Sequence, residues 1–266
     1  MVDIIITTYN RVSLLKQTMD ALFTTVNIPH RIFVIDDCSP DGTAEYLTKL
    51  QGDKLHFVVL SKKRNGIVYG FNTLWNMVEY FDSYYEQNPY LCYLQDDMVA
   101  TDPKWLQTLI RVYEDLRDKH NIGFFGGYDA PEHPVREYMQ WNGIPVVLKA
   151  SSSATNLIAE KSFWQSIGYV PRCIPDGTER GFPGKGKGSH IDLYLTGCMS
   201  RSQFVPHASA KNSLFLQGKN FMAVPGLLNH EGYAETHSTW RNEKPIKIQP
   251  ASAMHSPWHG NASVRP

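Results

Sequence analysis

Short apolar runs alternate with longer stretches of helical periodicity through the first hundred residues. Runs rich in β-branched and aromatic residues predict buried strands at 2–8, 32–35, 56–60 and 91–94. Apolar residues spaced three and four apart predict helices at 13–23, 43–50 and 69–81, with Ser13 and Thr43 as N-caps of the first two. Strands and helices that alternate in this way form βαβ units, so the pattern predicts an α/β fold with a mostly parallel sheet.

The second half of the chain is less regular. Its pattern predicts a helix at 105–117, a strand at 122–127 and two hairpin strands at 136–141 and 145–149. A glycine-rich, basic stretch at 175–195 then predicts a loop that leads into a helix near residue 190. Two interpretations of this loop stay open. It either orders over a bound nucleotide, with Lys185 and Lys187 toward the phosphates or a charged acceptor, or forms a basic surface loop.

Composition narrows the class of protein. Lys+Arg and Asp+Glu both number 26 in 266 residues, so no overall field attracts the chain to nucleic acid or anionic lipid. The four cysteines are scattered without a CxxC pair, which favours buried small hydrophobic residues over a zinc site or a disulfide framework. No apolar run approaches the ~18 residues that span a bilayer, and the N-terminus enters a strand directly. We therefore expect a cytoplasmic protein.

Polar side chains follow three of the predicted strands where each strand ends: Thr7, Thr8 and Tyr9, then Asp36 and Asp37, then Asp96 and Asp97. The carboxyl ends of parallel strands share one edge, where open α/β sheets bind ligands, so these groups are expected to line one cleft. Two adjacent carboxylates repel each other, and a divalent cation with oxygen ligands offsets that repulsion. The alternative is a solvated turn in which an acid caps the next helix.

Four segments, taken together, resemble family 2 of the GT-A glycosyltransferases. They are IIITTYNR, VIDDCSPDGT, NGIVYGFN and LQDDMVATDPKWL, and they follow one another in the order found in the family. The resemblance implies a Rossmann-like GT-A fold in a single domain over 1–241, with an extended tail at 242–266. Within it, residues 1–105 would form the half that binds the nucleotide sugar, and residues 106–241 the acceptor half.

The resemblance also implies a set of ligand-binding residues. Those assigned to the nucleotide of a nucleoside-diphosphate sugar, with a UDP-sugar favoured, are Thr7, Tyr9, Asp36, Asp37, Asn65, Gln95 and Asp96. Asp97 matches the last acid of the family's DXD motif, which ligates Mn²⁺ or Mg²⁺, and His230 is the implied further ligand. An imidazole ligand favours Mn²⁺. Gln95 departs from the motif, because it replaces the first acid and carries no charge.

The catalytic base is implied by a weaker match. The family motif Glu-Asp-x-Asp-Leu corresponds here to residues 189–193, where Ser and His replace the Glu-Asp pair. An inverting transfer needs a base that takes the proton of the acceptor hydroxyl as the hydroxyl attacks. His190 is one candidate, because a neutral imidazole suits this function near neutral pH. Asp192, which matches the motif, is the other candidate.

The expected function is an inverting, metal-dependent glycosyltransferase whose acceptor is a glycan or a lipid-linked glycan. One alternative is transfer to modified nucleic-acid bases, favoured by the basic loop and disfavoured by zero net charge. Another is a catalytically silent binding or scaffold protein, since Gln95 and the altered base motif depart from the family. A nucleotidyltransferase is disfavoured because residues 9–11 provide no glycine-rich triphosphate loop.

Overall fold

The computed structural model describes residues 1–131, 133, 135–167 and 218–232. Every helix and strand predicted in the first hundred residues is present there. The elements, in chain order, are β1 (Val2–Thr8), α1 (Val12–Thr25), β2 (His30–Asp36), α2 (Thr43–Leu50), β3 (Phe57–Leu60), α3 (Ile67–Asp82), β4 (Tyr90–Gln95), β5 (Met98–Ala100), α4 (Trp105–Leu116), β6 (Ile122–Gly126), β7 (Val135–Trp141), β8 (Ile144–Lys149), β9 (Asn156–Glu160), α5 (Lys161–Ile167), β10 (Asn220–Ala223) and β11 (Leu228–His230).

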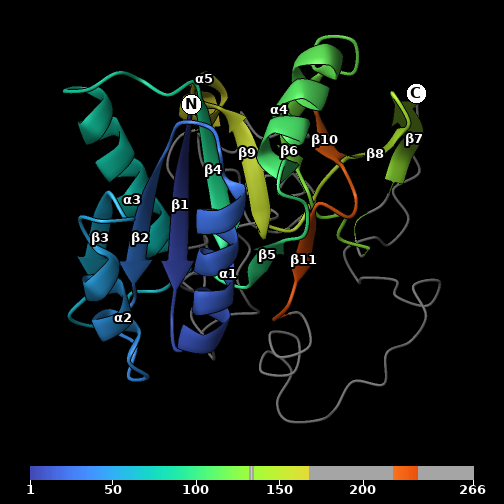
Figure 1. Ribbon diagram of the computed structural model, residues 1–266. Helices are drawn as coiled ribbons and strands as arrows, with labels where there is room; N and C mark the ends of the chain where they lie inside the picture. Colours follow the sequence, from blue (N-terminus) through green and yellow to red (C-terminus); the bar gives the residue numbers. More distant parts are fainter. Residues whose placement is uncertain (132, 134, 168–217, 233–266) are drawn as a thin grey trace, which may run out of the picture.

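One mixed sheet organises the described residues, with strand order β3-β2-β1-β4-β9-β6-β10-β8-β7 (Figure 1). β1 pairs in parallel with β2 and β4, and β2 with β3, as βαβ units require. β9 runs antiparallel between β4 and β6, and β7 and β8 form the predicted hairpin. Asn142 and Gly143 join this hairpin with φ of 47° and 83°, the left-handed conformation that a tight two-residue turn needs.

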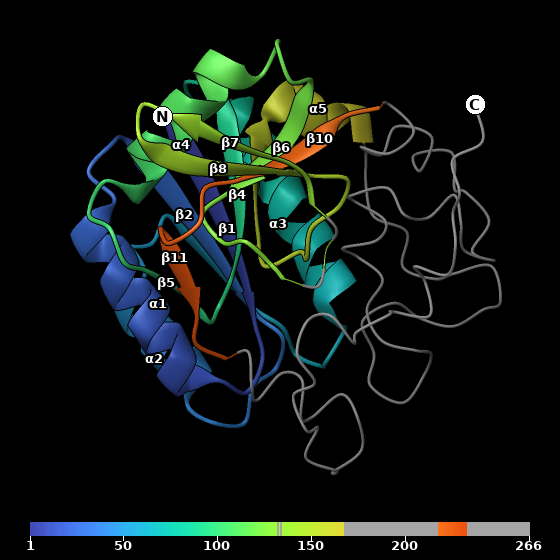
Figure 2. The ribbon, with the colours of Figure 1, turned by 90° about the vertical axis from the view of Figure 1, so that its right-hand side faces the viewer.

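Helices cover both faces of the sheet (Figure 2). Because alternate residues of a strand point to opposite faces, β1 contributes to two apolar cores. Ile4 packs in one core with Leu15 of α1 and with residues of α2 and α4. Ile5 packs in the other core with Phe71 of α3 and with α5. The buried strands are therefore apolar on both sides, which leaves their polar residues at the ends.

The two predicted N-caps are wrong. α1 begins at Val12, before Ser13, and α2 begins at Thr43 itself, after Gly42 in the left-handed conformation. Asp41 satisfies both helix starts. Its Oδ2 accepts the N–H of Val12 at 2.8 Å, and its Oδ1 accepts the N–H and the hydroxyl of Thr43 at 3.3 and 2.6 Å. A carboxylate is a stronger acceptor than a hydroxyl, so one acid replaces two weaker caps.

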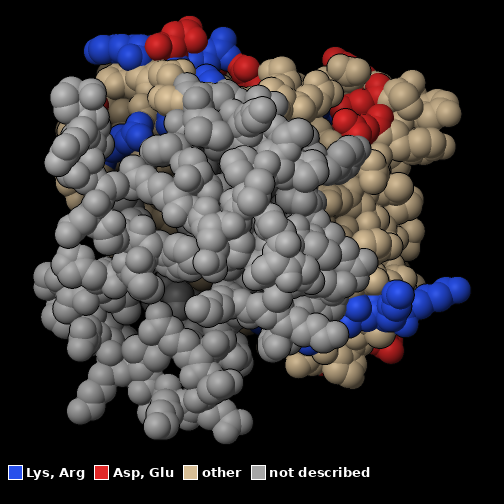
Figure 3. All heavy atoms as spheres, turned by 180° about the vertical axis from the view of Figure 1, so that it is seen from behind, with Lys and Arg blue, Asp and Glu red and all other residues tan. Residues whose placement is uncertain are grey.

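The surface and the cysteines test the expectations from composition. Cys92 is buried as expected, but Cys38 is exposed, with φ of 66°, because it lies in the loop after β2. No helix among the described residues is long and apolar enough to cross a bilayer. On the face seen from behind, acidic and basic side chains are interspersed along the rims of the described surface (Figure 3).

Candidate active site

Three neighbouring strands end together at one edge of the sheet. The register places Thr8, the last residue of β1, beside Asp36, the last residue of β2. β4 lies on the other side of β1 and is followed directly by Asp96 and Asp97, called here the acidic pair. The polar side chains that the sequence predicted to share one edge therefore do so.

Asp96 is held by the protein from three sides. Its Oδ2 accepts the hydroxyl of Thr8 at 2.6 Å, and its backbone carbonyl accepts the hydroxyl of Thr18 in α1 at 2.9 Å. Its Oδ1 lies 2.9 Å from a guanidinium nitrogen of Arg11. Burial raises the pKa of Asp96, and the charge of Arg11 opposes that shift. These contacts fix the turn that carries Asp97; nucleotide contact by Asp96 stays a prediction.

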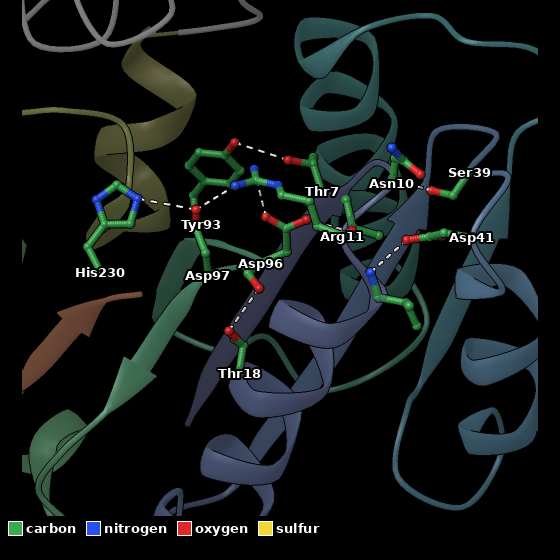
Figure 4. Close-up of polar contacts among 12 residues, drawn as sticks. Thr7, Asn10, Arg11, Thr18, Ser39, Asp41, Tyr93, Asp96, Asp97 and His230 are labelled. Atoms are coloured by element: carbon green, nitrogen blue, oxygen red, sulfur yellow. Dashed lines mark hydrogen bonds and ion pairs between the residues drawn. The ribbon is translucent and has the colours of Figure 1, made fainter. Parts of the chain in front are cut away.

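Asp97 is equally buried but less completely paired. Its Oδ2 accepts a hydrogen bond from Arg11 at 2.5 Å and lies 3.2 Å from Nε2 of His230 (Figure 4). Its Oδ1 has no hydrogen-bond partner among the described residues. Burial opposes ionisation, but the hydrogen bond with His230 and the charge of Arg11 outweigh it, so the pKa of Asp97 is lowered. Asp97 is therefore a buried, ionised carboxylate, one oxygen of which has no hydrogen-bond partner in the described part of the chain.

His230 reaches Asp97 through a second, two-stranded sheet. β11 pairs antiparallel with β5, and this register sets His230 opposite Met98. The N–H of Glu231 then donates to the carbonyl of Asp97 at 2.9 Å. At Gly232 the chain lies so close that a Cβ would be 2.3 Å from Oδ2 of Asp97. Only glycine fits there, and the segment after β11 covers the acid.

Arg11 is the site residue that the sequence analysis missed. Its two terminal nitrogens contact different acids, one Asp96 and the other Asp97 (Figure 4). The side chain of Arg11 is 30% exposed, whereas both acids are buried. Burial lowers the pKa of the guanidinium, but the charges of Asp96 and Asp97 outweigh this effect and raise it. The signal was available, because two buried like charges need a counter-charge. In the prediction from sequence, that counter-charge comes from a metal alone.

The loop that carries Arg11 is braced by the loop after β2. Asn10 adopts a left-handed conformation with φ of 53°, and its N–H donates to Oγ of Ser39 at 2.8 Å. The N–H of Val12 donates to Asp41, as described above. Side chains from one loop thus fix the backbone on both sides of Arg11 (Figure 4). Ser39 and Asp41 act on the protein backbone in this structure.

Asp36 and Asp37 have different surroundings. Asp37 accepts the backbone N–H groups of Asn65 at 2.8 Å and of Gly66 at 2.7 Å, one on each oxygen, at the start of α3. Asp36 accepts the hydroxyl and the N–H of Ser39, and burial raises its pKa despite these bonds. The structure thus gives Asp37 and Asn65 a helix-start contact. Their nucleotide contacts, and that of Asp36, stay predictions.

The remaining residues assigned to the nucleotide lie along the same edge. Thr7 pairs its hydroxyl with that of Tyr93 at 3.1 Å, and burial raises the pKa of Tyr93, which keeps it neutral. The guanidinium of Arg64 lies 4.0 Å from the centre of the Tyr9 ring, within cation–π range. Gln95 is half-buried at the end of β4. Their contacts with a nucleotide are likewise untested predictions.

Several predicted features fall outside the described residues. They are the candidate bases His190 and Asp192, the basic loop with Lys185 and Lys187, and the tail at 242–266. The division into donor and acceptor halves stays a prediction for the same reason.

Asp97 and His230 could together hold a divalent cation. Asp97 offers a buried oxygen with no hydrogen-bond partner among the described residues, and His230 offers an imidazole nitrogen beside the same carboxylate. Oxygen and imidazole donors suit Mn²⁺. Within the described part of the chain, no group of three or more His, Cys, Asp or Glu side chains is arranged to hold a metal. These two residues fit a metal that takes its other ligands from a bound substrate.

Comparison with known proteins identifies the family. The sequence model of glycosyl transferase family 2 matches residues 3–166. The chain belongs to glycosyl transferase family 2. The match includes all four segments from which the resemblance was first inferred, and the family prediction is confirmed. The matched residues also include every element that contributes to the site except β11.

Two solved structures are similar to this family 2 chain. The mannosyltransferase PcManGT from Pyrobaculum calidifontis, in complex with GDP-Man and Mn²⁺, matches with a TM-score of 0.51 and 13% identity over 90% of this chain and 60% of that one. S. aureus TarS in complex with UDP-GlcNAc matches with a TM-score of 0.45 and 16% identity over 64% of this chain. The chain spans 60% and 48% of the lengths of these two proteins. The GT-A fold prediction is confirmed. Among curated proteins, none matches the chain.

Proposed function

We propose that this protein transfers a sugar from a nucleoside-diphosphate sugar to an acceptor hydroxyl, with inversion and with the help of a divalent cation. The observation that carries the proposal is the meeting of Asp97 and His230 at the carboxyl edge of the parallel strands, 133 residues apart in sequence. One buried oxygen of Asp97 has no hydrogen-bond partner in the described chain. Membership of glycosyl transferase family 2 supports sugar transfer as the reaction class.

Asp97 and His230 would hold the cation, and Mn²⁺ suits their oxygen and nitrogen donors better than Mg²⁺ does. When bound, the cation supplies Lewis-acid stabilisation of the negative charge on the departing diphosphate. The protein's contribution is to keep the Asp97 carboxylate ionised in a buried place. Without a cation, Arg11 and His230 do this by lowering the pKa of Asp97.

The donor nucleotide would lie along the edge formed by β1 and β2. Tyr9 offers an aromatic surface for the base, and the guanidinium of Arg64 packs against the ring. Thr7 and Asp36 supply a hydroxyl and a carboxylate for the ribose or the base. A UDP-sugar is the favoured donor, and the complex of the similar mannosyltransferase with GDP-Man supports a nucleotide sugar.

The acceptor hydroxyl, on a glycan or a lipid-linked glycan, would lose its proton to His190 or Asp192 as its oxygen attacks the anomeric carbon. The bond from that carbon to the diphosphate oxygen breaks at the same time, and the diphosphate takes the electron pair. General-base catalysis of this kind contributes about 10²- to 10⁴-fold to the rate. His190→Ala and Asp192→Ala, assayed separately for transfer, identify the base by which substitution lowers kcat to this degree.

The binding test uses calorimetric titration of UDP, GDP, CDP and dTDP with and without Mn²⁺. We expect one diphosphate to bind tightly only with the metal, and Asp97→Ala to weaken that binding by at least about 100-fold because a metal ligand is lost. Asp102→Ala is the matched control, because it removes a carboxylate five residues from Asp97. Asp102 accepts the N–H of Lys104 at 2.6 Å, just before α4. Binding that is the same with and without Mn²⁺ would contradict the proposed metal site.

A further inference from the structure

We propose that Arg11 is an internal counter-cation that a divalent cation and a diphosphate displace together, so that Arg11 couples the binding of metal to the binding of donor. This inference rests on the proposed function, because it concerns the same site. It goes beyond that function by assigning Arg11 a thermodynamic effect: to make the metal alone bind weakly.

The contacts of Arg11 show what it does without a metal. One terminal nitrogen lies 2.5 Å from Oδ2 of Asp97 and the other lies 2.9 Å from Oδ1 of Asp96. Both acids are fully buried, and a buried pair of carboxylates without a counter-charge is costly. Arg11 therefore neutralises much of the charge that would otherwise draw a cation into the site.

The same contacts oppose a metal. Oδ2 of Asp97 already accepts a hydrogen bond from Arg11 and faces Nε2 of His230 at 3.2 Å. A cation held by Asp97 and His230 would place two positive charges next to a guanidinium, and like charges repel strongly where water is excluded. Metal binding and the Arg11–Asp97 contact therefore compete for one carboxylate.

A diphosphate changes the balance because it gives the displaced guanidinium a new partner. Arg11 is the partly exposed member of the cluster, and its backbone is fixed on both sides by Ser39 and Asp41. Displacement therefore requires rotation of the side chain and no movement of the loop. Guanidinium groups pair well with phosphate oxygens. The metal thus binds better when the diphosphate is present, and by linkage the diphosphate binds better when the metal is present.

The test measures Mn²⁺ affinity of the full chain by electron paramagnetic resonance, first with Mn²⁺ alone and then with saturating UDP or GDP. For Arg11→Gln we expect Mn²⁺ alone to bind about tenfold more tightly than it binds to wild type. The factor by which the diphosphate increases Mn²⁺ affinity should be at least about fivefold smaller than in wild type. Arg111→Gln is the control, because it removes one positive charge from α4, where Arg111 lies against Trp141. It should leave both quantities unchanged.

The outcomes separate this inference from the proposed function. If Arg11→Gln binds Mn²⁺ alone no more tightly than wild type, while wild type binds Mn²⁺ with the diphosphate, Arg11 is not a competitor and the inference is overturned. If neither protein binds Mn²⁺ under any condition, the proposed metal site itself is wrong. Should Arg11→Gln not fold, Arg11→Lys tests the same point, because it keeps a charge but cannot contact both acids in parallel. It should show a smaller shift in the same direction.

Discussion

Buried carboxylates lie at both ends of the parallel strands β1 and β4, and their surroundings differ. At the amino end, Asp3 belongs to a cluster with Arg31, Asp82, Lys161 and Asn88, called here the Asp3 network. Arg31 donates to both oxygens of Asp3 at 2.5 and 2.7 Å and to Asp82 at 2.6 Å. Lys161 contacts both carboxylates, and Asn88 donates to Asp3 at 2.6 Å. The two carboxylates thus face two cationic side chains, and each carboxylate oxygen has a partner.

At the carboxyl end, the acidic pair has one guanidinium for two carboxylates, and an oxygen of Asp97 has no hydrogen-bond partner among the described residues. Both clusters are buried, so burial alone does not distinguish structure from function. The difference lies in whether the polar groups are satisfied. A satisfied network contributes to stability, whereas an unsatisfied oxygen at a ligand-binding edge indicates that a ligand completes the site.

The largest expected effect on stability is at the Asp3 network. Asp3→Ala leaves Arg31 and Lys161 sharing Asp82 and should lower the free energy of unfolding by about 3–5 kcal/mol, because a buried charge loses its partner. Urea denaturation measures the loss. Asp53→Ala, at an exposed position in the turn before β3, is the control, with an expected change within about 0.5 kcal/mol. A loss below about 1 kcal/mol for Asp3→Ala would remove the contrast between the two ends.

A smaller loss is expected at Asp41, which braces Arg11 from outside the acidic pair. Asp41→Ala should cost about 1–2 kcal/mol, as loss of a helix cap does. Although burial opposes ionisation, the hydrogen bonds from Thr43 and Val12 outweigh it and lower the pKa of Asp41. Its contribution is therefore complete above the unfolded pKa of about 4 and disappears as pH falls through the lower folded pKa. Denaturation of both proteins between pH 7 and pH 2 measures this, and a difference independent of pH contradicts it.

Tyr93→Phe tests one uncharged hydrogen bond at the same edge. It removes the hydroxyl that pairs with Thr7 at 3.1 Å and should cost about 1 kcal/mol. Because Thr7 is only half-buried, water can replace the lost partner, which limits the effect. Phe71→Leu, a change beside the same ring that keeps the hydroxyl, separates packing from hydrogen bonding. Titration of the diphosphate with Mn²⁺ should show at most a small change in affinity for Tyr93→Phe.

Asp97→Asn should have the smallest effect on stability and the largest effect on binding of the diphosphate. Asp97→Asn loses an ion pair with Arg11 but also removes one of two adjacent negative charges, so the free energy of unfolding should change by less than about 1 kcal/mol. Metal-dependent binding of the diphosphate should disappear. If Asp97→Asn instead destabilises the protein as much as Asp3→Ala, the acidic pair is part of the structural framework, and the comparison made above fails.

The first hundred residues were predictable because their elements are set by local pattern. The range 2–8 was predicted for β1 and 43–50 for α2, and both agree with the structure. β5 and β11 were not predicted. Each has three residues, too few for periodicity to show, and each is stabilised by the other across the chain. Helix caps failed for a related reason, since Asp41 lies outside α1 in sequence and caps it only after folding.

The sequence predicted those site residues that lie at the end of a strand or match a family motif. Asp97 was named from the DXD motif and His230 as a further ligand that the resemblance implies, and the structure places the two in contact. Arg11 was not named, because its importance depends on contacts with residues 85 and 86 positions later in the chain. Sequence alone showed that the acids need a positive charge. Only the fold shows that the protein itself supplies one.

The pairing of β5 with β11 also determines when the site is assembled during synthesis. β1, β2 and β4 are translated within the first 95 residues, so the acidic pair and Arg11 can meet early. His230 leaves the ribosome only after 132 further residues have followed Asp97. Until β11 pairs with β5, the acidic pair and Arg11 are without His230, and only one of the two proposed metal ligands is in place.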